Sequence, residues 1–103
     1  MKKKARYVRH WTTPNGGVMM LIHVTPHLVF QDSQSNQRST HYLIVSAVDV
    51  PHSGPETFIF PANRSGDVIS WLELSGSYRG GLSHIKAIED AGYESITFPV
   101  LQS

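Results

Sequence analysis

The chain has 103 residues, of which 40% are hydrophobic, and a typical domain of about 100–150 residues buries a core of its own. Its 9 Lys and Arg residues and 8 Asp and Glu residues give a formal net charge of +1, so charge selects no class of partner. The absence of cysteine excludes disulfides, thiolate catalysis and zinc sites built on cysteine. No apolar run reaches the about 18 residues that cross a bilayer, and we expect a cytoplasmic protein with no membrane partner.

Basic residues are concentrated at the start of the chain. Five of the 9 lysines and arginines precede the first expected turn, namely Lys2, Lys3, Lys4, Arg6 and Arg9. Because chain termini are commonly disordered, we expect residues 1–5 to form a flexible basic arm. Such an arm either contacts phosphate groups or only helps to keep the chain in solution.

Two strands are expected first. Residues 6–13 alternate along the chain, which predicts a strand with Tyr7, Arg9 and Trp11 on one face and Arg6 on the other. An Asn-Gly pair then predicts a tight turn, since both residues tolerate positive φ. The next run is apolar on both faces, which is typical of a central strand.

Polar and apolar runs alternate over the middle of the chain. The polar stretch 32–39 has too little apolar surface to order itself, which predicts a mobile hairpin loop. Residues 41–48 are the most β-prone run, and residues 56–60 predict a further strand. Residues 68–74 fit a strand, irregular structure or a short helical turn, and we favour the first two.

One helix is expected near the end of the chain, over residues 83–91. Ser83 is a suitable N-cap, and Gly92 fits the left-handed position that follows a helix. Helical spacing turns four apolar residues toward the sheet, namely Leu82, Ile85, Ile88 and Ala91. A last strand over residues 95–101 contains Pro99, which favours an edge position.

These elements predict a single α+β domain over residues 1–103. Its sheet should be curved and antiparallel, with about five to six strands, and the helix should pack on one face. Charged residues make up 17% of the chain, against roughly 25% in an average soluble protein. A low charge indicates a surface covered by a partner or by a second copy, so a homodimer is among the expected assemblies.

The segment that leads into the helix is the best candidate for a functional surface. Glycines let a backbone approach a ligand closely, and the N–H groups at a helix start attract anions. Arg79 offers a planar fork of donors that suits phosphate, and Tyr78 offers a stacking face. We predict that a partner or a small nucleotide binds there without catalysis. The residues are Ser75, Ser77, Tyr78, Arg79, Gly80, Gly81, Ser83 and His84.

Two other interpretations stay open. The segment also fits a structural corner, in which Tyr78 packs on the core and Arg79 pairs with Glu73. Alternatively, the start of the chain binds nucleic acid, because a strand face with cations and aromatic rings resembles single-strand binding platforms. The residues of that interface would be Lys2, Lys3, Lys4, Arg6, Arg9 and Trp11.

Patterns for catalysis and for metal binding are weak. A small hydrolase would pair His84 with Ser77 or Ser83, but no carboxylate is evident to orient the histidine. The chain has 6 histidines. On a strand, however, His23 and His27 would lie about 13 Å apart, too far for one ion. We predict no catalytic residue, no metal site and no cofactor.

The C-terminal half carries a pattern that resembles small uncharacterised accessory proteins of bacteriophages and prophages. In that pattern a strand, an acidic-polar turn, a Leu-x-Gly-Ser-aromatic-Arg-Gly loop and a short helix ending in Ala-Gly-Tyr follow one another. Here the loop is Leu74-Ser75-Gly76-Ser77-Tyr78-Arg79-Gly80 and the helix ends at Ala91-Gly92-Tyr93. Phage accessory proteins of this size often bind host components. The resemblance therefore implies an anti-defence protein in the host cytoplasm that binds a host protein or a small nucleotide signal.

Overall fold

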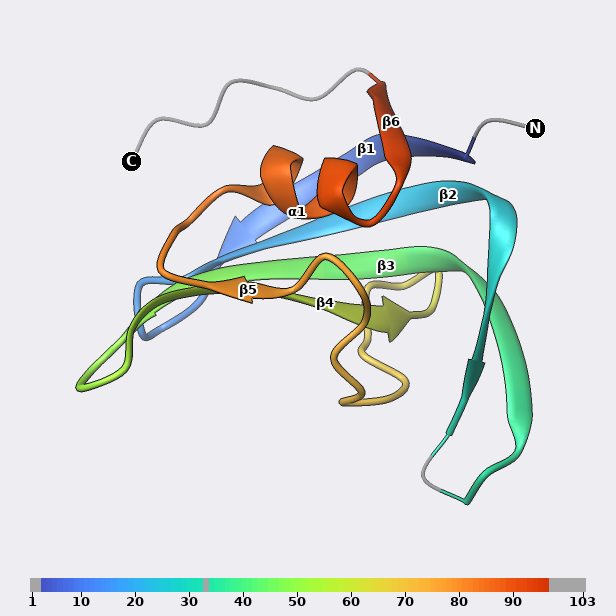
Figure 1. The fold of residues 1–103 in the computed structure, drawn as a ribbon, viewed down its shortest axis with the longest axis horizontal. Helices are drawn as coiled ribbons and strands as arrows, with labels where there is room; N and C mark the ends of the chain where they lie inside the picture. Colours follow the sequence, from blue (N-terminus) through green and yellow to red (C-terminus); the bar gives the residue numbers. More distant parts are fainter. Residues whose placement is uncertain (1–2, 33, 97–103) are drawn as a thin grey trace.

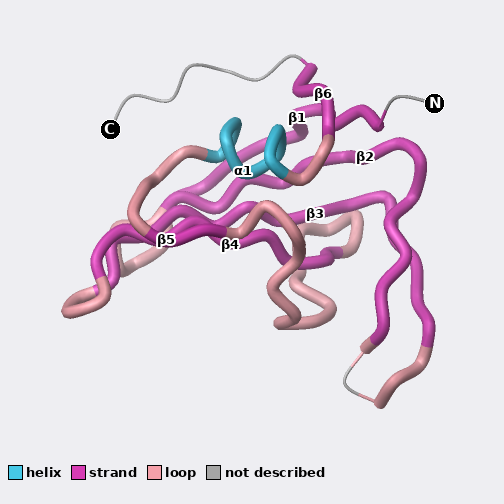
Figure 2. Tube along the Cα trace, in the orientation of Figure 1, coloured by secondary structure: helices cyan, strands magenta, loops and turns pink. Residues whose placement is uncertain are grey.

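Six strands in the order β5-β4-β3-β2-β1-β6 form one curled sheet in a computed structural model that describes residues 3–32 and 34–96 (Figure 1). The strands are β1 (Lys3–Thr12), β2 (Val18–Gln31), β3 (Gln37–Val50), β4 (Gly54–Ala62), β5 (Tyr78–Arg79) and β6 (Tyr93–Ile96). Figure 2 shows a short helix, α1 (His84–Asp90), beside these strands. The expected small domain, with one curled sheet and one helix, is confirmed.

The last strand differs from its expected direction. β1 to β4 are antiparallel neighbours, but β6 runs parallel to β1, with Lys3 opposite Tyr93 and Arg6 opposite Ile96. Because β5 and β6 occupy opposite edges, the chain crosses the sheet through α1 and arrives beside β1 in the same direction. The expectation of a purely antiparallel sheet is therefore wrong. The edge position is confirmed for Tyr93–Ile96, whereas Pro99 lies outside the described residues.

The hairpin of β2 and β3 is longer than expected. Residues 37–40 pair with β2, with Gln37 opposite Gln31, so the ladder extends into the stretch predicted to be a mobile loop. The register shifts between His23 and Leu28, and beyond this point the hairpin bends away from the rest of the sheet (Figure 1). The observed loop is therefore shorter than the predicted one, because backbone pairing with β2 orders polar residues that bury little apolar surface.

Hydrophobic side chains pack on both faces of the sheet. On the side that we call the helix face, Met20 and Val45 are at most 1% exposed and cluster with Ala87 and Ile88 of α1. Alternation along a strand sends the next residue to the other side, which we call the open face. A smaller cluster lies there, formed by Leu21, Ile44 and Ala62.

The ends of α1 follow the sequence, but its buried side does so only in part. Ser83 accepts a hydrogen bond from the Lys86 N–H, as an N-cap does, and Gly92 has a φ of +94°. Leu82 and Ile85, however, are 51% and 38% exposed. The helix has only 7 residues and buries His84, Ala87 and Ile88, so the predicted apolar face is confirmed for Ile88 and for Ala91, which packs against the larger cluster, and is wrong for Leu82 and Ile85.

Residues 68–74 are irregular, one of the two forms that we favoured. Val68 makes an isolated bridge to Ala62, and the N–H of Leu74 donates to the Ile59 carbonyl. Val68 also packs on the smaller cluster, so this segment lies over part of the open face.

The start of the chain is part of the sheet. Lys3, Lys4 and Ala5 pair with β6, and Ala5 is 0% exposed within the larger cluster. The expectation of a flexible arm is therefore wrong for these residues, because burial of Ala5 and pairing on both sides anchor the strand. Residues 1 and 2 lie outside the described part.

Candidate functional site

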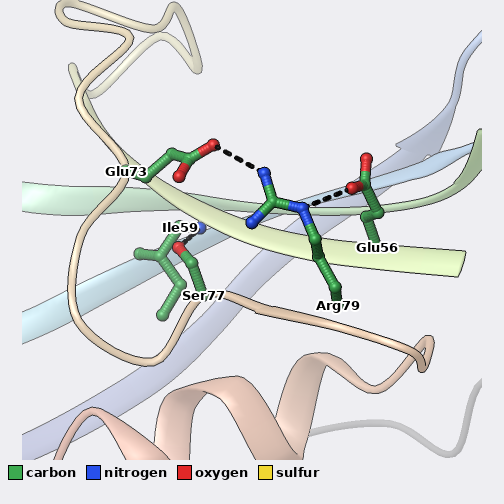
Figure 3. Close-up of polar contacts among 5 residues, drawn as sticks. All are labelled: Glu56, Ile59, Glu73, Ser77 and Arg79. Carbon is green, nitrogen blue, oxygen red and sulfur yellow. Dashed lines mark hydrogen bonds and ion pairs between the residues drawn. The ribbon is translucent and has the colours of Figure 1, made fainter. Parts of the chain in front are cut away.

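Arg79, the central residue of the predicted site, is held between two carboxylates (Figure 3). Its Nε donates to Oε2 of Glu56 at 2.8 Å, and its Nη2 lies 3.9 Å from Oε1 of Glu73. The side chain of Glu56 is 9% exposed, against 67% for that of Arg79. Because two negative charges already surround this guanidinium, it is poorly placed to hold a phosphate.

The backbone around Arg79 is tied to β4. The Ser77 hydroxyl accepts a hydrogen bond from the Ile59 N–H at 2.9 Å (Figure 3). The Gly80 N–H donates to the Pro55 carbonyl at 2.7 Å, and the Gly81 carbonyl accepts from the Thr57 hydroxyl at 2.8 Å. Tyr78 packs against the larger cluster on the helix face. These contacts match the structural corner, including its pairing of Arg79 with Glu73.

The remaining members of the predicted site do not converge. Ser75 lines a hollow of about 220 Å³ beside Val29 and Leu74, whereas Ser83 caps α1. His84 is buried, and its Nε2–H donates to the Val18 carbonyl at 3.0 Å. Burial lowers the pKa of His84, so the ring is neutral at pH 7.

The serine–histidine pair that a small hydrolase would need is not formed. Within residues 3–32 and 34–96, neither Ser77 nor Ser83 makes a hydrogen bond to the ring of His84. The two hydroxyls instead accept backbone N–H groups, and the imidazole is fixed by a carbonyl of β2. The pairing that the hydrolase alternative needs is therefore absent from the described residues.

Three histidines meet where the β2–β3 hairpin bends. The rings of His23 and His41 are stacked at 5.4 Å, and His27 meets His41 edge-on at 5.7 Å. The irregular register of β2 brings His27 to this cluster. Partial burial, His41 and Arg6 lower the pKa of His23. No group of three His, Cys, Asp or Glu side chains in the described chain is arranged to hold a metal ion.

A bulge in β1 changes which residues share a face. Arg6 lies opposite His23 and Arg9 lies opposite Leu21, while Val8 is the extra residue between these pairs. One extra residue reverses the alternation that follows it. Arg6, Arg9 and Trp11 therefore all lie on the open face. Expectations from regular alternation were wrong for two residues, since they separated Arg6 from Arg9 and grouped Tyr7 with Arg9.

The lysines of the predicted nucleic-acid interface do not all join these three residues. The Nζ of Lys3 lies on the helix face, 4.4 Å from the ring centroid of Tyr93 and 3.3 Å from the Ala91 carbonyl oxygen. Lys4 precedes the bulge and alternates with Ala5, so it lies on the open face with Arg6, and among the described residues it makes no ion pair with Glu94, its register partner. Lys2 lies outside the described residues.

Trp11 begins a row of side chains that crosses the open face. It lies opposite Met19, Met19 lies opposite Ser46, and Ser46 lies opposite Phe58. All four are half-buried, and the row spans about 14 Å across four strands. We call it the aromatic row, defined as Trp11, Met19, Ser46 and Phe58. The guanidinium of Arg9 covers Trp11 at 4.5 Å, and that of Arg79 covers Phe58 at 5.3 Å.

Unpaired cations gather at the Trp11 end of the aromatic row. Arg6, Arg9 and Arg64 make no ion pair with any residue that the structure describes. The Nη2 of Arg9 donates to the Ser65 carbonyl at 2.7 Å, which holds the turn against β1. Arg64 is exposed in the same turn. This end of the row thus carries positive charge with no carboxylate partner in the described chain.

Sequence reasoning missed most of the aromatic row. Met19, Ser46 and Phe58 come from three different strands, and only the register of the sheet makes them neighbours. The alternation of each strand was a usable signal, but it does not say which residues face each other.

Comparison of the chain with protein-family models, curated proteins and solved structures gives no match. The resemblance to phage accessory proteins, the host-protein partner and the cytoplasmic location therefore stay predictions. In the described part of the chain, no helix is long and apolar enough to cross a membrane.

Proposed function

We propose that this chain is a non-catalytic binding protein that holds single-stranded nucleic acid on the open face of its sheet. The bulge at Val8 carries the proposal, because it joins Arg6 and Arg9 to Trp11 on one face. Phosphate-binding cations and a stacking surface then lie side by side. This combination is what binding of single strands requires.

The charges favour a polyanion. Arg6, Arg9 and Arg64 are exposed, and in the described chain none of them has a carboxylate partner. A guanidinium offers two parallel N–H donors to phosphate oxygens. Binding would release the counterions condensed on the strand, so affinity should fall with salt by roughly 0.7 log units per phosphate contact for each log unit of salt.

The aromatic row favours unpaired bases. Its two aromatic rings are half-buried under the guanidinium groups of Arg9 and Arg79, and bases that are not paired in a duplex can stack on guanidinium planes as well as on aromatic rings. A row of about 14 Å accommodates two or three nucleotides at roughly 6 Å each. The carboxylates around Arg79 favour an orientation in which phosphates lie at the Trp11 end.

Fluorescence anisotropy with a labelled oligothymidine of about 12 nucleotides tests the proposal. The unaltered chain should bind with an affinity that falls as salt rises. The double variant Arg6→Ala with Arg9→Ala should bind at least about tenfold more weakly and with a shallower salt slope, since each phosphate contact contributes to both.

Lys86→Ala is the matched control. It also removes a cation, but from α1, where Lys86 pairs with Asp90 at 2.6 Å. Its affinity should equal that of the unaltered chain. Absence of binding at low salt, or equal loss in the control and the double variant, would refute the proposal; circular dichroism checks that each variant is folded.

A further inference from the structure

A second hollow lies on the open face, between the tip of the β2–β3 hairpin and residues 69–72. In Figure 1 the hairpin tip bends down on the same side of the sheet as the segment that follows β4. The hollow has a volume of about 620 Å³, within the roughly 300–1,000 Å³ of small-molecule sites. Its lining includes Gln31, Asp32, Gln34, Arg38, Trp71 and Leu72.

Trp71 gives this hollow a stacking surface. Its indole is 72% exposed, although large aromatic side chains are usually well buried. It meets the ring of Phe60 at 5.2 Å and 73°, an edge contact that positions the indole. Phe60 itself is 9% exposed and belongs to the sheet, so Trp71 is supported from below while most of its surface faces solvent.

Polar groups beside Trp71 complement a nucleotide. Arg38 is exposed and makes no ion pair among the described residues. Gln31 and Gln34 each bring a carboxamide, which has both donors and an acceptor and can match the edge of a base. Oδ1 of Asp32 accepts the N–H groups of Gln34 and Asn36, each at 2.9 Å, so this carboxylate is used to shape the hairpin tip.

Aromatic contacts join this hollow to the aromatic row. Phe58, the last member of the row, meets Phe60 at 6.1 Å, and Phe60 meets Trp71 at 5.2 Å. Ring contacts therefore link the row to Trp71 through Phe60, which is itself only 9% exposed. Only the irregular segment after β4 makes this possible, because it carries the indole across the open face to the hairpin.

We propose that this hollow is a base pocket that takes one purine nucleotide, with the base stacked on Trp71 and the phosphate bound by Arg38. The inference rests on the proposed function and adds base selectivity to it. Purines are favoured because the hollow is wide and because their larger rings gain more from stacking on an indole.

Because the pocket and the aromatic row each contain one tryptophan, tryptophan fluorescence can report binding at the two places separately. The chain has 2 tryptophans, so Trp11→Phe leaves only the indole of the pocket and Trp71→Phe leaves only that of the row. We expect adenosine monophosphate to quench Trp71 saturably in the Trp11→Phe chain. Adding Arg38→Ala should weaken this binding about tenfold, since a charge-assisted contact is lost, whereas adding Lys86→Ala should not change it.

The oligonucleotides then separate failure of the pocket from failure of the function. We expect oligoadenosine to bind about tenfold more tightly than oligothymidine of equal length, and Trp71→Ala to abolish this preference. If Trp71 fails to respond to the nucleotide while Trp11 responds to oligothymidine, the pocket is refuted and the proposed function stands. If the nucleotide quenches Trp71 but no oligonucleotide binds, the pocket stands and the proposed function is refuted.

Discussion

The carboxylate of Glu56 is buried on the open face, and the guanidinium of Arg79 supplies its hydrogen bond at 2.8 Å. The two residues lie opposite each other across the short pairing of β4 with β5. An arginine in a glycine-rich loop suggested ligand binding, yet here it neutralises a buried charge of its own chain. Its role is therefore primarily structural.

Removal of Arg79 should destabilise the fold. Arg79→Ala leaves the Glu56 carboxylate buried without a charged partner, and we expect the free energy of unfolding to fall by about 1–3 kcal/mol. Arg38→Ala removes an exposed arginine that makes no ion pair in the described chain, so its stability should stay within about 0.5 kcal/mol. Urea denaturation of both variants makes the comparison. Equal stability of the two would contradict the structural role.

The packing of α1 is tested by two isoleucines of the same helix. Ile88 is 0% exposed and Ile85 is 38% exposed. Ile88→Ala should cost about 2–5 kcal/mol, because it opens a cavity under the helix. Ile85→Ala should cost well under half as much. A reversed order of the two denaturation midpoints would contradict the burial of Ile88 in preference to Ile85.

Two glycines of the loop separate backbone strain from close packing. Gly76 and Gly80 both have positive φ, at +101° and +98°. A Cβ at Gly76 would meet the Ala87 carbonyl oxygen and come within 2.9 Å of Ile59 Cδ1, whereas nothing lies within 4 Å of one at Gly80. Gly80→Ala should thus cost about 1 kcal/mol for strain alone, and Gly76→Ala clearly more. Thermal denaturation measures both, and equal losses would contradict the close approach of the loop to α1.

Stability should depend on the titration of His84. Burial lowers its pKa below the ordinary value of 6.5, so the unfolded chain binds a proton more readily than the folded one. The stabilisation from the neutral ring is complete above about pH 6.5 and is lost as pH falls through the lowered pKa. His84→Gln keeps an N–H donor for Val18 and should flatten the acid dependence. Urea denaturation between about pH 5 and about pH 7.5 tests this, and an unchanged slope would exclude His84 as the titrating group.

Local chemistry predicted several elements correctly. Ser83 caps α1 because its hydroxyl accepts a hydrogen bond from the backbone of the first turn, and Gly92 ends the helix because glycine tolerates positive φ. Residues 41–48 form a core strand, since β-branched and aromatic side chains favour a pleated, buried surface. These features depend on near neighbours in the chain, which the sequence displays directly.

Errors arose where a distant segment decided the outcome. The basic start of the chain becomes part of the sheet because β6 pairs beside it. His84 points into the protein because its ring donates a hydrogen bond to the Val18 carbonyl of β2. Three histidines meet only because the β2 register shifts beside His27. Such contacts join residues far apart in sequence, and no local pattern encodes them.

The sequence by itself determined the class of fold, the ends of the helix and the presence of cations and aromatic rings near the start of the chain. Only the tertiary structure decided which of these residues share a face of the sheet and which charges are paired. A single bulge at Val8 aligned Arg6 with Arg9 and Trp11, while Glu56 and Glu73 neutralised Arg79. The physical reason is that propensity acts over a few residues, whereas register and charge pairing depend on strands that meet only after folding.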